Sequence, residues 1–138
     1  MRKQALQWTT AVLALVPTLT GLVGLAGLDD PLYAAAHLPR DATLDSNLRF
    51  YAGVWLGLGI AAWSVIPGIE RQGGLFRLLW AMIFLGGLGR LLSLALVGLP
   101  FPPFVGFTAL EVLGAPLFIW WQHRVAVAAD AALTPARS

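Results

Sequence analysis

The apolar positions of the chain fall into four long runs, separated by short polar stretches. The runs cover about residues 5–28, 48–67, 75–98 and 104–122. Each run is close to the ~20 apolar residues that a helix needs to cross ~30 Å of hydrocarbon. We therefore predict an all-α polytopic membrane protein, a four-transmembrane-helix bundle, with one domain over residues 1–125 and a cytoplasmic tail over residues 126–138.

The composition supports a membrane protein and excludes several other classes. The chain is 58% hydrophobic and 12% charged, with a mean hydropathy of +0.75, which is outside the usual balance of a soluble domain. A net charge of +2 is too small for a nucleic-acid-binding surface. With no cysteine, the sequence has no disulfide, thiol nucleophile or thiolate metal site. His37 and His123 lie far apart in the sequence, so we expect no histidine metal site.

The first apolar run has two interpretations. Arg2 and Lys3 precede it, and the segment Ala34-Ala35-Ala36 follows, which fits a signal peptide. The run is longer than the 7–15 residues typical of a signal peptide, however. We therefore predict a retained transmembrane helix.

One substantial polar loop, residues 29–46, follows this helix. Its middle, residues 32–38, fits a short helix lying in the membrane interface, with Asp29 or Asp30 as N-cap and Pro39 as terminator.

The basic residues predict the orientation of the chain. Arg40 and Arg49 are the only lysines or arginines expected on the loop side, whereas the side of the two termini holds Arg2, Lys3, Arg71, Arg77 and Arg124. Basic residues concentrate on the cytoplasmic side, so both termini should be cytoplasmic. Two sets of aromatic residues fall near opposite ends of the runs, as interfacial belts do. Near the cytoplasmic ends are Trp8, Trp63, Trp80, Trp120 and Trp121, and near the outer ends are Tyr33, Tyr51, Phe101 and Phe104.

Two apolar runs carry one ionisable residue each in their middle, Arg90 and Glu111. Between them, the segment 98–103 contains three prolines and must reverse the chain. Counting from this turn places both residues ~11–12 Å from the same end of adjacent antiparallel helices. Because an arginine within an apolar helix needs an internal partner, we predict an ion pair.

Other polar residues are candidates for the same ligand-binding site in the outer half of the membrane. They are Arg49, Asn47, Tyr51, Thr108 and Ser93. If Arg49 points inward, its spare positive charge would suit an anionic or carbonyl-bearing head group; Asp45, four residues earlier, is its local alternative partner. No catalytic residue and no particular cofactor is indicated.

The ion pair has alternative roles. It can be a structural clamp between two helices, without any ligand. Glu111 can instead serve a small isomerase-like membrane enzyme or a proton-linked carrier, but the sequence has no inverted repeat, P-loop, dinucleotide fingerprint or zinc motif. Small-residue stripes at Gly21–Gly24 with Gly27, or at Gly53–Gly57, offer surfaces to other subunits or to a second copy.

Several of these residues form a recognisable pattern. The segment Asn47-Leu-Arg-Phe-Tyr-x-Gly, the dipeptide Gly89-Arg90, and Glu111 followed by Pro116 resemble a widespread bacterial family of four-helix integral membrane proteins known only as a domain of unknown function. The similarity covers about residues 7–124, and the four-helix topology is similar to that of the DoxX-like membrane proteins. The resemblance implies a bacterial inner-membrane location and marks Asn47, Arg49, Arg90 and Glu111 as family-like polar positions. It implies no activity.

We therefore expect a non-catalytic protein of the lipid bilayer. It would be either an accessory subunit of a larger complex or a binder of a lipid-soluble molecule such as a quinone, lipid or pigment.

Overall fold

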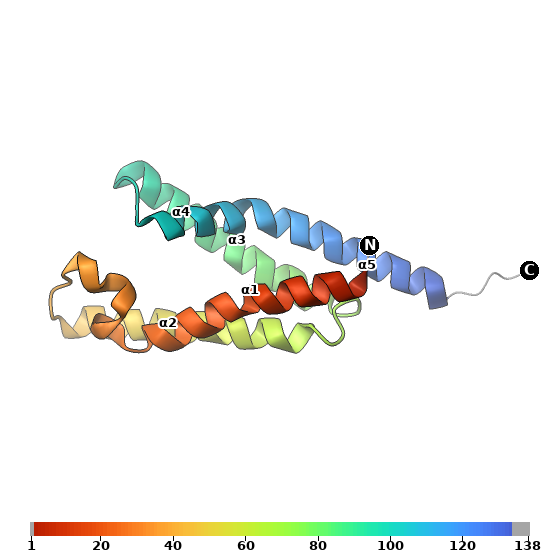
Figure 1. The fold of residues 1–138 in the computed structure, drawn as a ribbon, viewed down its shortest axis with the longest axis horizontal. Helices are drawn as coiled ribbons and strands as arrows, with labels where there is room; N and C mark the ends of the chain where they lie inside the picture. The colour runs from red at the N-terminus through yellow and green to blue at the C-terminus, as the bar shows by residue number, and fades with distance from the viewer. Residues whose placement is uncertain (1, 134–138) are drawn as a thin grey trace, which may run out of the picture. The chain divides into compact units, whose positions relative to one another are not determined.

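The computed structural model describes residues 2–133, which are helical throughout apart from short connections and contain no β-strand (Figure 1). Over this range the predicted all-α fold is confirmed. The chain divides into two compact units, one of residues 7–66 and the other of residues 67–133 together with residues 2–6.

The unit of residues 7–66 pairs two long helices, α1 (Lys3–Gly24) and α2 (Ala42–Val65). Glycines let the backbones of these two helices approach closely. At Gly21 the space is so small that an added Cβ would lie 2.6 Å from the Leu56 nitrogen. A Cβ at Gly59 would similarly lie 2.8 Å from the Thr18 nitrogen. Small residues at a helix interface are the usual means of close packing in lipid.

Aspartate caps shape the connection between α1 and α2. It contains two short 3-10 helices, η1 (Gly27–Asp29) and η2 (Pro31–Ala36). The Asp30 carboxylate accepts a hydrogen bond from the Leu32 N–H at 2.8 Å, so Asp30 is the predicted cap of the short helix. Asp41 caps α2 in the same way, and α2 therefore starts at Ala42, before residue 48 where its apolar run begins. The polar loop predicted over residues 29–46 is thus largely helical.

The unit of residues 67–133 contains α3 (Gly73–Leu96), α4 (Pro102–Ala109), η3 (Leu110–Gly114) and α5 (Ala115–Leu133). The last three are consecutive, and η3 is a π-helical turn inside one long helix antiparallel to α3. Aromatic side chains form the centre of this unit. Trp80 stacks on Phe118 with ring centroids 4.5 Å apart, and Phe118 in turn stacks on Trp121.

Four helical segments are long and apolar enough to cross a membrane: Lys3–Gly24, Ala42–Val65, Gly73–Leu96 and Pro102–Leu133. The prediction of four spans is confirmed. The last segment extends past residue 125, where we placed the end of the domain, because residues 126–133 are mostly alanine, a strong helix former. The remainder of the predicted tail, residues 134–138, lies outside the described residues.

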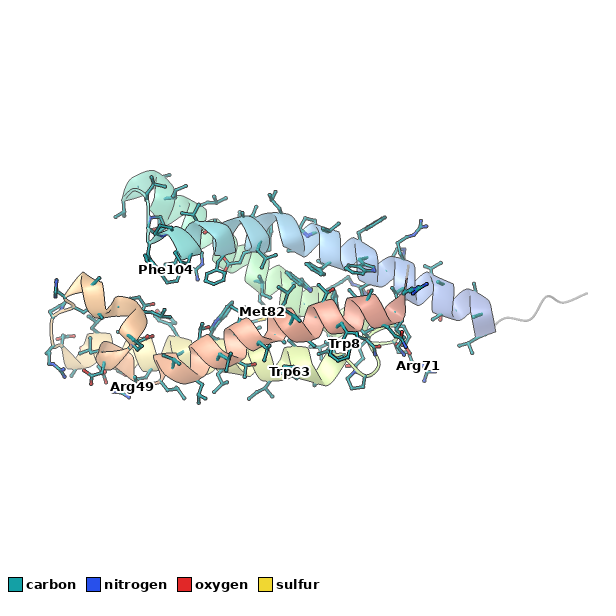
Figure 2. All side chains as sticks on the ribbon, in the orientation of Figure 1. Trp8, Arg49, Trp63, Arg71, Met82 and Phe104 are labelled. Atoms are coloured by element: carbon teal, nitrogen blue, oxygen red, sulfur yellow. The ribbon has the colours of Figure 1, made fainter. Side chains whose placement is uncertain are left out.

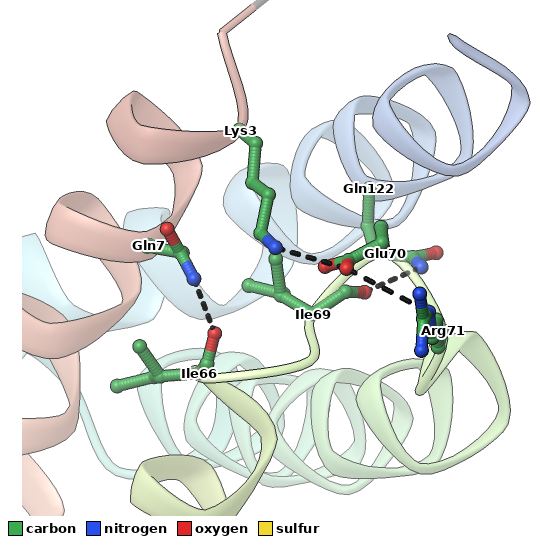
Figure 3. Close-up of polar contacts among 7 residues, drawn as sticks. All are labelled: Lys3, Gln7, Ile66, Ile69, Glu70, Arg71 and Gln122. Atoms are coloured by element: carbon green, nitrogen blue, oxygen red, sulfur yellow. Dashed lines mark hydrogen bonds and ion pairs between the residues drawn. The ribbon is translucent and has the colours of Figure 1, made fainter. Parts of the chain in front are cut away.

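Polar side chains hold the turn that connects α2 and α3, residues 66–72 (Figure 3). The buried Gln122 amide donates a hydrogen bond to the Ile69 carbonyl at 2.9 Å, which ties the turn to α5. Lys3 Nζ lies 2.9 Å from Glu70 Oε1, and within the other unit Gln7 donates to the Ile66 carbonyl. Side-chain amides thus satisfy the backbone carbonyls of Ile66 and Ile69 in this turn.

We expect the Lys3–Glu70 contact to make stability depend on acid pH. The hydrogen bond from Lys3 lowers the pKa of Glu70, with a smaller effect from the backbone of Glu70. A glutamate whose pKa is lower in the folded state stabilises the fold above its ordinary pKa, and this contribution is lost as the pH falls through the folded-state pKa. Lys3→Met should therefore flatten the acid side of a melting-temperature profile, at a cost below about 1 kcal/mol for this partly exposed pair.

Lys3→Arg is the matched control, because it keeps the charge. Melting temperatures of the detergent-solubilised protein, measured from about pH 3 to pH 7 around the carboxyl pKa range, compare the three proteins. An acid dependence in Lys3→Met equal to that of the unaltered protein would show that Glu70 gains nothing from Lys3.

Candidate functional site

Arg90 and Glu111 form an ion pair, as their equal depth predicts. Arg90 lies in α3 and Glu111 in η3, and Arg90 Nε is 3.0 Å from Glu111 Oε2. The Glu111 side chain is 9% exposed, whereas the Arg90 side chain is 37% exposed. The carboxylate is therefore sealed inside the unit, while part of the guanidinium reaches its surface.

The π-helical turn that carries Glu111 has a local cause. Pro116 has no backbone N–H and its ring clashes with the carbonyl four residues earlier, that of Val112. A π-turn, with hydrogen bonds from residue i+5 to residue i, removes the bond that proline cannot make. The helix thus widens at Leu110–Gly114, directly before the proline.

Gly87 of α3 gives Glu111 its space. A Cβ at this position would lie 2.8 Å from the Glu111 Cβ and 2.9 Å from Val112 Cγ2. Neighbouring Gly86 and Gly89 have no heavy atom within 4 Å of an added Cβ. Among the three glycines before Arg90, Gly87 alone allows the π-turn to approach α3.

The Phe104 ring is a second partner of Arg90. The guanidinium carbon lies 5.1 Å from the ring centroid, a cation–π contact (Phe104 is labelled in Figure 2). The pattern of polar residues in the sequence does not indicate this contact. Phe104 stands seven residues before Glu111, which is two helical turns, and that spacing is the signal that could have revealed it.

The hydrogen-bonding capacity of the pair is only partly used. Glu111 Oε2 is buried, and the Arg90 N–H is not directed well enough to form a hydrogen bond with it despite the short distance. Over residues 2–133, the Arg90 guanidinium has one ion-pair partner, Glu111, and one ring contact, Phe104. A guanidinium has five N–H donors, so donors remain for another acceptor.

The other predicted site residues of this unit make no contact with the pair. Thr108 is buried, but its hydroxyl donates to the Phe104 carbonyl in its own helix. Ser93 is exposed on α3. A ligand-binding role for either residue stays a prediction.

The remaining predicted site residues, Arg49, Asn47 and Tyr51, lie on α2 in the other unit. Arg49 Nε is 2.7 Å from Asp45 Oδ2, and Arg49 also donates to the Leu25 carbonyl (Figure 2 labels Arg49). Of the two partners considered for Arg49, the structure shows the local aspartate. Asn47 and Tyr51 are exposed within this unit, and their part in a ligand site also stays a prediction.

No group of three histidine, cysteine, aspartate or glutamate side chains among residues 2–133 could hold a metal ion. His37 ends η2 in a left-handed conformation, with φ of 47°.

Fold and site together define a polytopic helical membrane protein with an intramembrane arginine–glutamate pair. More particularly, residues 5–122 match the family described as "Domain of unknown function (DUF4345)", and the chain belongs to this family. No curated protein and no solved structure matches the chain. The expected membership of a family of unknown function is confirmed, and the similarity to DoxX-like topology stays a prediction.

Proposed function

We propose that this protein is a non-catalytic binder of a lipid-soluble small molecule, held at the Arg90–Glu111 pair. The observation that carries the proposal is the division of the pair into a sealed carboxylate and a partly exposed guanidinium, at 9% and 37% exposure. An ion pair that serves only as a clamp between two helices should have all its donors and acceptors satisfied within the protein. Here the cation retains donors at the surface of the unit.

The position of Arg90 in the middle of an apolar helix makes its unsatisfied donors energetically costly. Within hydrocarbon an N–H group without an acceptor costs several kcal/mol, because no water is present to bind it. Intramembrane ionisable residues therefore mark ligand or ion sites by default. A lipid-soluble molecule with an oxygen acceptor, such as a quinone, lipid or pigment, would satisfy the remaining donors of Arg90.

We place the protein in the bacterial inner membrane as a four-helix domain with both termini in the cytoplasm. The excess of lysine and arginine at the ends that carry the termini supports this orientation. The described turn between α2 and α3 lies at the same end, since Lys3 contacts Glu70 there. The pair then opens toward the outer half of the membrane.

Extraction in mild detergent followed by mass spectrometry of co-purifying molecules tests this function. We expect a small molecule bound to the unaltered protein and lost from the Arg90→Ala/Glu111→Ala double variant, which removes both charges together. Arg77→Ala is the matched control, because it removes an exposed arginine of the same helix. Retention of the molecule by the double variant would refute the proposed site.

An accessory-subunit role is a second candidate. Gly53 and Gly57 on α2 have no heavy atom within 4 Å of an added Cβ, so this small-residue stripe is free to receive another helix. Gly21 and Gly24 are no longer candidates for that role, because they pack on Leu56 and Ala52 of α2. The same extraction separates the two roles, since a subunit should bring a partner protein that persists in the double variant.

An enzyme or a proton carrier that uses Glu111 would need proton donors or acceptors next to the carboxylate. The described residues do not show such groups there. The described contacts of Glu111 are Arg90 and the close backbone at Gly87.

A further inference from the structure

The chemical character of the ligand follows from the groups around Arg90. Glu111 approaches the guanidinium at Nε, and Phe104 lies against it at 5.1 Å. The Nε side and the ring contact are therefore occupied, and the terminal N–H groups remain. These groups are hydrogen-bond donors only, so the ligand must present an oxygen or nitrogen acceptor.

The charge of the site favours a neutral ligand. A permanently charged guanidinium and a carboxylate at 3.0 Å sum to zero formal charge. A phosphate or carboxylate head group would add a negative charge beside Glu111 in a medium of low dielectric constant, where like charges repel strongly. The second cation that could have balanced it, Arg49, is engaged by Asp45 and the Leu25 carbonyl in its own unit.

The aromatic side chains next to Phe104 favour a flat ligand. Phe101, Phe104 and Phe107 form a row of edge-to-face contacts, with both neighbouring pairs of centroids 6.2 Å apart. Phe101 is 62% exposed and so presents a free aromatic surface next to the guanidinium's ring partner. Aromatic rings prefer to receive another flat ring in an offset or edge-to-face arrangement.

We infer that the ligand of the Arg90 site is a neutral, lipid-soluble ring ketone of the quinone class. Its carbonyl oxygen would accept the terminal N–H groups of Arg90, and its ring would lie against the row of phenylalanines. This inference rests on the proposed binding function and narrows its ligand. It involves binding only and no redox step.

Native mass spectrometry of delipidated protein tests the inference with two probes. Decylubiquinone supplies a neutral ring ketone, and phosphatidylglycerol supplies an anionic lipid head group. We expect decylubiquinone to bind at one molecule per chain, and about tenfold more weakly to Phe104→Leu, which removes one ring contact. Arg90→Ala should abolish binding, and Phe104→Leu keeps the test decisive if Arg90→Ala does not fold.

Trp120→Leu is the matched control, because Trp120 carries the other arginine–ring contact of this unit, with Arg124 at 6.0 Å. It should bind decylubiquinone as the unaltered protein does. Binding of phosphatidylglycerol without decylubiquinone would overturn the ring ketone and leave the binding function standing. If neither probe binds and the extracted protein carries no small molecule, both the ring-ketone ligand and the proposed binding function would be overturned.

Discussion

Arg90→Ala is expected to destabilise the protein by up to about 3–5 kcal/mol, the usual cost of leaving a buried charge without its partner. The variant leaves the Glu111 carboxylate 9% exposed without its cation. Arg90 is the one ion-pair partner that Glu111 has among residues 2–133. The free energy of unfolding in mixed detergent micelles measures the effect.

The double variant Arg90→Ala/Glu111→Ala provides the control for this result. It removes the uncompensated charge, so it should be more stable than Arg90→Ala alone. Arg77→Ala should change stability by less than about 0.5 kcal/mol, as exposed substitutions usually do. If Arg90→Ala resembled Arg77→Ala, the ion pair would contribute nothing to the fold.

Gly87→Ala should have the next largest effect, a loss of about 1–3 kcal/mol from overpacking. The added methyl group would meet both Glu111 Cβ and Val112 Cγ2 at less than 3 Å. Relief requires α3 and the π-turn to separate, which would also lengthen the contact between Arg90 and Glu111. Unfolding free energy measures the first consequence, and retention of the co-purifying molecule measures the second.

Gly86→Ala is the matched control on the adjacent residue, where an added Cβ meets open space. Alanine has the higher helix propensity, so this variant should be neutral or up to about 1 kcal/mol more stable. A loss of stability in Gly87→Ala, with no loss in Gly86→Ala, is the expected outcome. Equal effects would mean that the close approach at Gly87 is not tight.

Much of the fold can be predicted from the sequence because a membrane imposes simple rules. Apolar length identifies the four spans, and equal depth from the proline turn brings Arg90 opposite Glu111. Helix starts are less predictable, since a cap such as Asp41 begins α2 within a polar segment. Hydropathy reports where a helix is buried in lipid, whereas capping reports where the helix begins.

The details of the site could not be predicted in the same way. Periodicity places Gly86, Gly87 and Gly89 near Arg90 but does not say which of them a neighbouring helix approaches. The same limit applies to α2, where Gly59 packs on Thr18 while Gly53 and Gly57 stay open. The π-turn could have been anticipated, because Pro116 follows Glu111 by five residues and must disturb the hydrogen bonds before it.

The continuous helical segment from Pro102 to Leu133 is longer than one crossing of the membrane requires. Its 32 residues, at ~1.5 Å of rise per residue, span ~48 Å, whereas the hydrocarbon core is ~30 Å thick. Tilting absorbs only part of this excess length. Some of its helical turns must therefore lie outside the hydrocarbon core, in the head-group region or beyond it.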